Sequence, residues 1–416
     1  MTTQRWAIAR FVVGVVVLAA LLDFWAGWAL PVVILAILLM VMGHEFGHFI
    51  TAKRAGLLVS DFFVGFGPVV WSTTVGETRY GVRLLPLGGY VKVPGMTWSD
   101  TVDPALESRT YRAASYPRKV LFASAGSLMH LVMALVLAWA SLTFVGLPSA
   151  SHVGIASFTH FDGQRLNPAQ LAGLHVGDQV LSIDGVSITD ANRLVKLVHD
   201  HTGERLRIVV ERHGVRRTLY AVPEDGRRLR VGGQRVATGS TPVGYLGIGL
   251  QDLIVHQSLL GAIPASVAKV TSIVGLAAKG IVHVFSPGEF SSLFHQVTNP
   301  VAATNRTAQL NRPQSIVGVV RIAVQSTSLG VGVLLEILMV MNIFVGLLNM
   351  VPMLPLDGGY VLIATYERLR SRRGRAYHAD VQRLLPVVYA FSLVLLALFA
   401  ATLYLDIVHP IANPFQ

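Results

Sequence analysis

Two histidines and a glutamate lie close together in a strongly apolar stretch of this sequence. His44, Glu45 and His48 belong to the segment MVMGHEFGHFI, residues 40–50. On a helix, residues four positions apart lie on one face, one turn apart, so both imidazoles can bind one metal ion. Glu45 is offset around the helix, where its carboxylate can contact a metal-bound water without being a ligand. Zinc lowers the pKa of that water to about 7 and the glutamate takes its proton, so the spacing predicts hydrolytic zinc chemistry.

The alternative is that these three side chains form a polar cluster that only reaches the water at the end of a membrane helix. Lys53, which lies close by, favours that alternative. Against it, each ionisable side chain within a span costs at least about 2.5 kcal/mol on insertion scales. Three of them within five residues therefore favour a bound ligand or a wet cavity.

A catalytic zinc needs a third protein ligand and an open coordination position. The chain has no cysteine, which excludes disulfides, thiolate metal sites and cysteine nucleophiles and leaves histidine and carboxylate ligands. Our candidate is Asp357 in NMVPMLPLDGGY, residues 349–360, where prolines interrupt helical hydrogen bonding and two glycines allow close approach of the backbone. The alternative is that Asp357 caps a helix beginning near Gly359.

The composition indicates an integral membrane protein. Of 416 residues, 52% are hydrophobic and 14% are charged, whereas soluble proteins carry about 25% charged residues. The formal net charge of +11 fits basic loops beside membrane spans, and we recognise no nucleic-acid-binding motif. We therefore predict that the chain lies in a lipid bilayer and binds no nucleic acid.

Five apolar stretches have the length of about 20 residues that a membrane-spanning helix needs. They are residues 11–30, 31–50, 119–146, 331–351 and 384–405. A cleaved signal peptide is the alternative for the first, but the second follows at once without a clear small-residue cleavage site between them. Residues 256–285 predict an amphipathic helix on the membrane surface, with a sixth span as the alternative.

Basic residues set the orientation, because lysine and arginine are enriched in cytoplasmic loops. The two strongest basic signals, at residues 53–54 and 368–383, both fall on the cytoplasmic side of one five-span topology. The amino terminus is then inside, and residues 147–330 and the carboxyl terminus are outside. This topology gives Asp357 and His48 the same depth and the same side, as a shared metal site requires.

Two parts of the chain have the pattern of small β structures. Residues 60–96 combine short apolar runs with glycine and proline, which predicts strands and hairpins that dip towards the membrane. Residues 168–222 predict a small domain of strands joined by tight turns, with a helix starting near Asp190. The turn residues are Asp184, Gly185, His213 and Gly214.

The segments HEFGH at residues 44–48 and NMVPMLPLDGG at 349–359 resemble the two signature motifs of the site-2 protease family of intramembrane metalloproteases. The likeness is strongest to its bacterial regulated-proteolysis branch, which cleaves anti-sigma factors. VGFGPVVW and YGVRLLPLGGYVKVPGM look like the membrane-associated β-hairpin region of that family, and residues 168–222 resemble its PDZ domain. The resemblance covers about residues 30 to 405.

The resemblance implies a polytopic α-helical membrane protein. A four-helix site-2-protease core would carry one extra N-terminal span, a membrane-associated β-hairpin region and an inserted PDZ-like α+β domain. The expected parts are an additional N-terminal transmembrane helix (1–30), a first core helix with HEFGH (31–52), the β-hairpin region (53–118), a second core helix (119–146), the PDZ-like domain (150–250), an amphipathic helix with an irregular region (251–330), a third core helix with LDGG (331–365), a basic cytoplasmic loop (366–383) and a fourth core helix (384–408).

The resemblance also implies the roles of single residues. His44, His48 and Asp357 would bind Zn2+, Glu45 would be the catalytic base, and Asn349 would contact the substrate backbone. The β-hairpin would bind the substrate as an added strand, because a helical peptide bond hides its carbonyl within the helix.

The second core helix departs from the pattern of many members, which have Ala-Gly-Pro followed by an asparagine. Here the stretch reads SAGSLMHL, with Ser127 and His130. His130 could be a polar cavity residue or a rival metal ligand. We favour packing or hydrogen bonding within the helix bundle and leave His130 out of the metal set.

The expected function is that of an intramembrane zinc endopeptidase of the bacterial cytoplasmic membrane. It would cleave transmembrane segments of single-span proteins, such as anti-sigma factors in stress signalling, after an upstream site-1-type protease has cut them outside. The extracytoplasmic PDZ-like domain would screen substrates by size or by their new carboxyl terminus. The alternative is a non-proteolytic, zinc-containing membrane scaffold. A metal transporter would need ionisable residues across the bilayer, and the spans offer few besides the site, chiefly Glu336 and His130.

Overall fold

The computed structural model describes residues 2–96, 100–371, 377, 379 and 381–413. Three arginines of the predicted basic loop therefore lie outside the described residues, namely Arg372, Arg373 and Arg375. The chain divides into two compact units. Residues 1–141 and 263–416 form a mainly helical unit, and residues 142–262 form a unit of mainly β structure.

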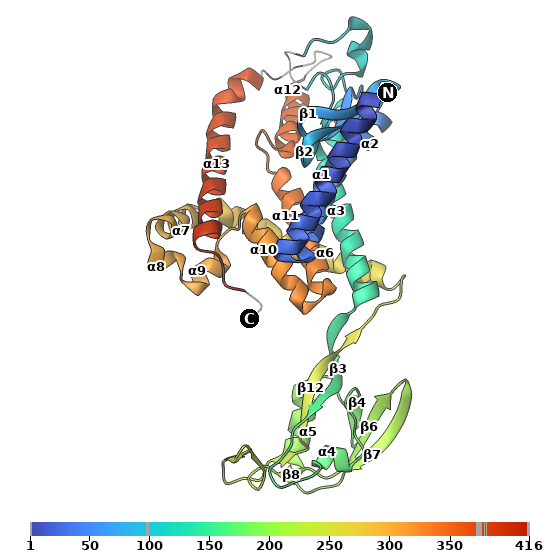
Figure 1. Ribbon diagram of the computed structural model, residues 1–416, viewed down its shortest axis with the longest axis vertical. Helices are drawn as coiled ribbons and strands as arrows, with labels where there is room; N and C mark the ends of the chain where they lie inside the picture. The colour runs from blue at the N-terminus through green and yellow to red at the C-terminus, as the bar shows by residue number, and fades with distance from the viewer. Residues whose placement is uncertain (1, 97–99, 372–376, 378, 380, 414–416) are drawn as a thin grey trace. The chain divides into compact units, whose positions relative to one another are not determined.

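Long apolar helices dominate the first unit (Figure 1). They are α1 (Thr2–Ala26), α2 (Ala29–Arg54), α3 (Tyr116–Ala140), α6 (Ala262–Val284), α11 (Val331–Asn349) and α13 (Leu385–Val408). Among the described residues, five helices are long and apolar enough to cross a membrane: α2, α3 with the turn that follows it, α6, α11 and α13. The apolar stretch found in α1, residues 12–24, is shorter. A turn at Gly27, with a φ of 77°, separates α1 from α2.

Helix α6 has two properties that bear on its relation to the membrane. Its length and composition would allow it to cross, which was the alternative in the sequence analysis. In Figure 1, however, α6 runs across α3 and α11 rather than alongside them. Val270 of α6 packs there against Ala134 and Ala138 of α3 and Met339 of α11. A helix crossing the direction of its neighbours fits the predicted surface position, which stays a prediction.

Residues 286–330 were expected to be irregular, but they are mostly helical. They form α7 (Pro287–Thr298), α8 (Pro300–Ala303), α9 (Arg306–Asn311), α10 (Ile316–Ser326) and a 3-10 turn (Thr327–Leu329). A serine or asparagine side chain caps the amino terminus of each of these α-helices, namely Ser286, Asn299, Asn305 and Ser315. These caps are the sequence signal that could have predicted the helices.

Small residues bring α2 and α3 into close contact. A Cβ atom at Gly47 would lie 2.6 Å from the carbonyl oxygen of Ala125, and one at Gly43 would meet the sulfur of Met133 at 2.5 Å. Glycine at these two positions allows the helices to approach more closely than larger side chains would. As a result the face of α2 that carries His44 and His48 lies directly against α3.

One long hairpin occupies the region predicted as strands and hairpins. It consists of β1 (Asp61–Val75) and β2 (Thr78–Lys92). The hairpin curls so that Asp61 pairs with both Arg79 and Lys92. The first part of β1 therefore lies between the two ends of β2, which leaves residues 89–92 as an outer strand of this sheet.

The second unit is built on an antiparallel sheet with the strand order β12-β3-β4-β6-β7, with β5 paired to β4. These strands are β3 (Leu147–Phe158), β4 (Gln179–Ile183), β5 (Val186–Ser187), β6 (Leu206–Arg212), β7 (Val215–Ala221) and β12 (Ile248–Val255). Short pairs form between β8 (Glu224–Asp225) and β11 (Gly244–Tyr245), and between β9 (Arg230–Val231) and β10 (Gln234–Arg235). Helices α4 (Pro168–Leu171) and α5 (Ala191–Asp200) complete the unit.

The local predictions for the second unit are confirmed. Asp184 and Gly185 have φ values of 47° and 83° in the turn between β4 and β5. His213 and Gly214 have φ values of 51° and 77° between β6 and β7, as a tight two-residue hairpin turn requires. The side chain of Asp190 accepts the backbone N–H of Arg193 and so caps α5 at its predicted start. The unit has its own apolar core beneath this sheet.

Candidate active site

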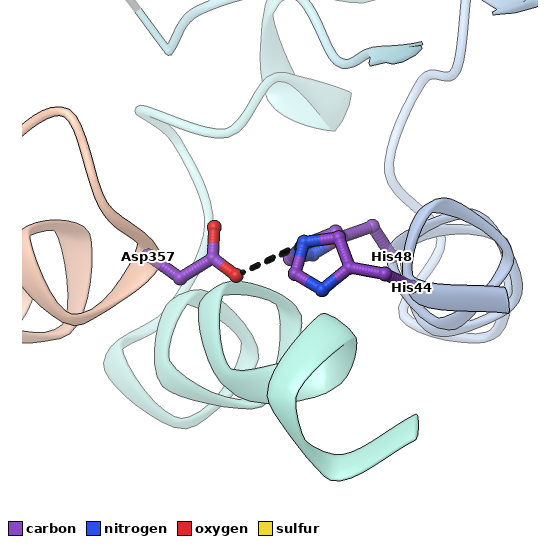
Figure 2. A group of neighbouring side chains, drawn as sticks. All are labelled: His44, His48 and Asp357. Carbon is purple, nitrogen blue, oxygen red and sulfur yellow. Dashed lines mark hydrogen bonds and ion pairs between the residues drawn. The ribbon is translucent and has the colours of Figure 1, made fainter. Parts of the chain in front are cut away.

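The three candidate metal ligands come together at one point. The Nε2 atoms of His44 and His48 are 3.2 Å apart, and Oδ2 of Asp357 lies 3.3 Å from each of them. Figure 2 shows the carboxylate of Asp357 pointing at the two imidazole rings of α2. The three side chains are only 12%, 9% and 20% exposed. The helical spacing of the histidines therefore presents both rings to one carboxylate from a distant part of the sequence.

The backbone of helix α3 contacts the rings of the two histidines and fixes their orientation. Nδ1 of His48 lies 2.8 Å from the carbonyl oxygen of Phe122. Because a carbonyl oxygen can only accept, Nδ1 carries the proton and Nε2 is left with a lone pair that faces Asp357. The ring of His44 lies over Gly126, where a Cβ atom would overlap it. Backbone contacts of this kind orient the imidazoles of metal sites.

Asp357 is positioned by the break in the chain before it. It is the first residue of α12 (Asp357–Arg370), whose N-cap residue is Leu356, so the alternative role of Asp357 as the helix cap is wrong. A Cβ atom at Gly359 would lie 2.6 Å from the backbone nitrogen of Leu354, and one at Gly358 would overlap the Met350 carbonyl. The two glycines thus let α12 begin directly against the preceding turn. The positive end of the helix also favours the carboxylate.

The donor atoms fit a zinc ion. Tetrahedral zinc with bonds of about 2.0–2.1 Å to nitrogen and oxygen keeps its ligand atoms about 3.3 Å apart. The three observed separations are 3.2, 3.3 and 3.3 Å. Oδ2 of Asp357 is buried and has no hydrogen-bond partner among the described residues. A buried carboxylate oxygen that faces imidazole lone pairs is costly without a cation between them.

A cavity of about 150 Å³ opens at these atoms. It is lined by His44, Glu45, His48, Val91, Met96, Phe122, Ala123, Asp357 and Tyr360. Glu45 thus shares a small cavity with the three candidate ligands, as a base acting on water must. Val91, Met96 and Tyr360 were not among the site residues predicted from the sequence. Tyr360 directly follows the LDGG motif, so its nearness in sequence was the available signal.

Two other predicted or considered residues are not members of this group of ligands. Asn349 is the last residue of α11, and the described residues that line the cavity do not include it. His130 is hydrogen-bonded to Asn342 at 3.1 Å within the helix bundle, as we favoured from the sequence. The group of side chains found close enough to share one metal ion consists of His44, His48 and Asp357.

Comparison with known proteins identifies the family to which this sequence belongs. The sequence model of Peptidase family M50 matches residues 32–396. The chain belongs to peptidase family M50, the site-2 proteases. It is 31% identical over 402 residues to the zinc metalloprotease Rip1 of Mycobacterium tuberculosis, covering 91% of this chain and 96% of Rip1. It is 29% identical over 412 residues to Rip1 of Mycolicibacterium smegmatis, covering 91% and 97% of the two chains.

This membership decides the class of the protein. It is a site-2-type zinc metalloprotease with several apolar helices of membrane-spanning length, and hence a multi-pass membrane protein. Zn2+ is its metal, in agreement with the His44, His48 and Asp357 group. The alternative of a non-proteolytic scaffold is not favoured.

Proposed function

We propose that the protein is an intramembrane endopeptidase that cleaves transmembrane segments of single-span membrane proteins. His44, His48 and Asp357 would bind the zinc ion, and Glu45 would act as the base. The observation that carries this proposal is the triangle of ligand atoms, 3.2–3.3 Å on each side, which shares its cavity with Glu45. Bound zinc would supply an acidified water at this point. The Glu45 carboxylate would receive the proton of that water.

The outer strand of the curled hairpin supports a mode of substrate binding. Residues 89–92 form this outer strand, and Val91 lines the cavity together with Glu45. An outer strand offers unpaired backbone N–H and C=O groups to an incoming segment. A substrate that unwinds and adds here would expose its carbonyl groups beside the base. Asn349 would contact the substrate backbone further along the same segment.

A groove in the second unit supports a PDZ-like role. A cavity of about 330 Å³ lies between α5 and the segment leading into β12. Leu194 and Val198 of α5 line one side, and Leu246 and Ile248 line the other. We propose that this domain faces the extracytoplasmic side of a bacterial cytoplasmic membrane and holds the carboxyl terminus that an upstream protease creates. Anti-sigma factors are the class of substrate that we propose.

The experiment that tests catalysis is a Glu45→Gln substitution. We expect the purified variant to retain zinc and to lose cleavage, while single-span proteins accumulate uncut in the membranes of cells that carry it. Proteomics of those membranes would identify the substrates. Glu336→Gln is the matched control, because Glu336 pairs with Lys269 and does not line the cavity among the described residues. Cleavage retained in the Glu45→Gln protein would refute the proposal.

A further inference from the structure

A third histidine lies against the candidate metal site. The ring centroids of His130 and His44 are 5.1 Å apart, and the rings are tilted by 44°. His130 is 1% exposed. We infer that His130 is a positioning residue, whose Nε2 accepts a hydrogen bond from Nδ1–H of His44 and thereby orients His44 towards the zinc ion. This inference rests on the proposed role of His44 as a ligand.

The protonation of His130 follows from its partner on α11. The Nδ2 group of Asn342 donates to the carbonyl oxygen of Leu338 at 2.8 Å. Because that carbonyl can only accept, the orientation of the Asn342 amide is fixed and its Oδ1 is an acceptor. Oδ1 lies 3.1 Å from Nδ1 of His130, so Nδ1 of His130 donates. A neutral imidazole with its proton on Nδ1 presents Nε2 as an acceptor.

His44 needs an acceptor of this kind. If Nε2 of His44 binds the metal, its Nδ1 must carry the proton. Metal-binding histidines almost always donate that second N–H to an acceptor, which fixes the ring orientation. Nδ1 of His44 is buried beside the Gly126 backbone and makes no hydrogen bond of normal geometry in the described part of the chain. The His130 ring is its neighbour, with the two ring centroids 5.1 Å apart.

The packing around His130 is suited to a fixed support. Gly346 of α11 lies against it, since a Cβ atom there would be 2.8 Å from the Cβ of His130. The hydrogen bonds that join Leu338 and Asn342 on α11 to His130 on α3 would then continue to His44 on α2, whose ring lies beside that of His130. We therefore expect a shift of α11 to change the orientation of the His44 ring.

The first test removes the acceptor. In His130→Leu we expect zinc affinity, measured by competition with a chelator, to fall by about 10–100-fold, the usual cost of losing such a partner. His130→Gln keeps an N–H group for Asn342 and an oxygen acceptor for His44, and should recover most of the affinity. The unfolding midpoint is measured alongside, because a merely structural role of His130 would lower the midpoint without lowering the zinc affinity of the folded protein.

The second test removes the anchor. Asn342→Leu should weaken zinc binding, and the double variant with His130→Leu should be no weaker than His130→Leu alone, because Asn342 acts through His130. Ser141→Ala is the matched control. It deletes another buried polar group of the same helical segment, 2% exposed and unpartnered among the described residues, whose loss should leave zinc affinity unchanged.

The outcomes separate this inference from the proposed function. Unchanged zinc affinity in His44→Leu would overturn the role of His44 as a ligand and the inference with it. If His44→Leu loses zinc while His130→Leu binds it like the parent, only the inference fails. Additive effects of the His130 and Asn342 substitutions, or an equal loss in Ser141→Ala, would also overturn it.

Discussion

A buried ion pair lies on the helix that carries Asp357, the candidate third ligand. Nζ of Lys119 on α3 lies 2.8 Å from Oε2 of Glu367 on α12, with the side chains 9% and 12% exposed. Glu367 also accepts the backbone N–H of Ala379 at 3.0 Å. Because Asp357 is the first residue of α12, this pair anchors the other end of the helix that supplies the carboxylate.

Glu367→Gln should destabilise the protein strongly. The substitution leaves a buried ammonium group whose nearby ring, Tyr111, is 5.6 Å away at its centroid. Leaving one buried charge without its partner costs about 3–5 kcal/mol. Replacing both partners, as in Lys119→Met with Glu367→Gln, removes the charge itself and should cost clearly less than the sum of the two single substitutions.

The assay is reversible unfolding in detergent micelles, with zinc affinity measured alongside. We expect zinc binding to weaken in the Glu367→Gln protein, because α12 is no longer held at that end. If the free energies of unfolding of the single variants lie within about 1 kcal/mol of the parent, the pair is already solvated like a surface pair. That result would refute the reasoning. Additive costs in the double variant would equally refute the reasoning.

Two further predictions concern the helix contact behind the site and the curled hairpin. Gly126→Ala should abolish zinc retention because its Cβ would displace the His44 ring, whereas Gly275→Ala on α6, with nothing within 4 Å among the described residues, should bind zinc normally. Hydrogen bonds from Arg109 and Lys53 lower the pKa of Glu77 to about 2. Its stabilising contribution should be complete above about pH 4.5 and disappear as the pH falls towards 2. Thermal unfolding of Glu77→Gln should lack this part of the pH dependence, and an unchanged profile would contradict it.

Local rules predicted much of this structure from the sequence. The spacing of His44 and His48 fixed their shared face, because the helical repeat is a property of the backbone. Asp190 marked the start of α5, and the two tight turns of the second unit followed from residues that tolerate positive φ. Asp357 was selected because the prolines and glycines around it interrupt a helix, and the structure brings it to the histidines.

Contacts between distant helices could not be predicted in this way. The pairing of His130 with Asn342 joins residues 212 positions apart, and it depends on how α3 packs against α11. The cavity lining by Val91 depends on the curl of the hairpin, which no local pattern encodes. The direction of α6 is likewise a matter of packing, since its composition suits either a crossing or a surface position.

The division of the ligands between α2 and α12 has a consequence for the order in which the protein is made. Ribosomes deliver the two histidines first, and the carboxylate of Asp357 emerges 309 residues after His48. A nascent chain therefore carries an incomplete set of the proposed ligands until Asp357 has been made. The proposed metal site can form only after α2, α3 and α11 have been made, so a nascent chain that ends before α12 would lack a complete catalytic centre.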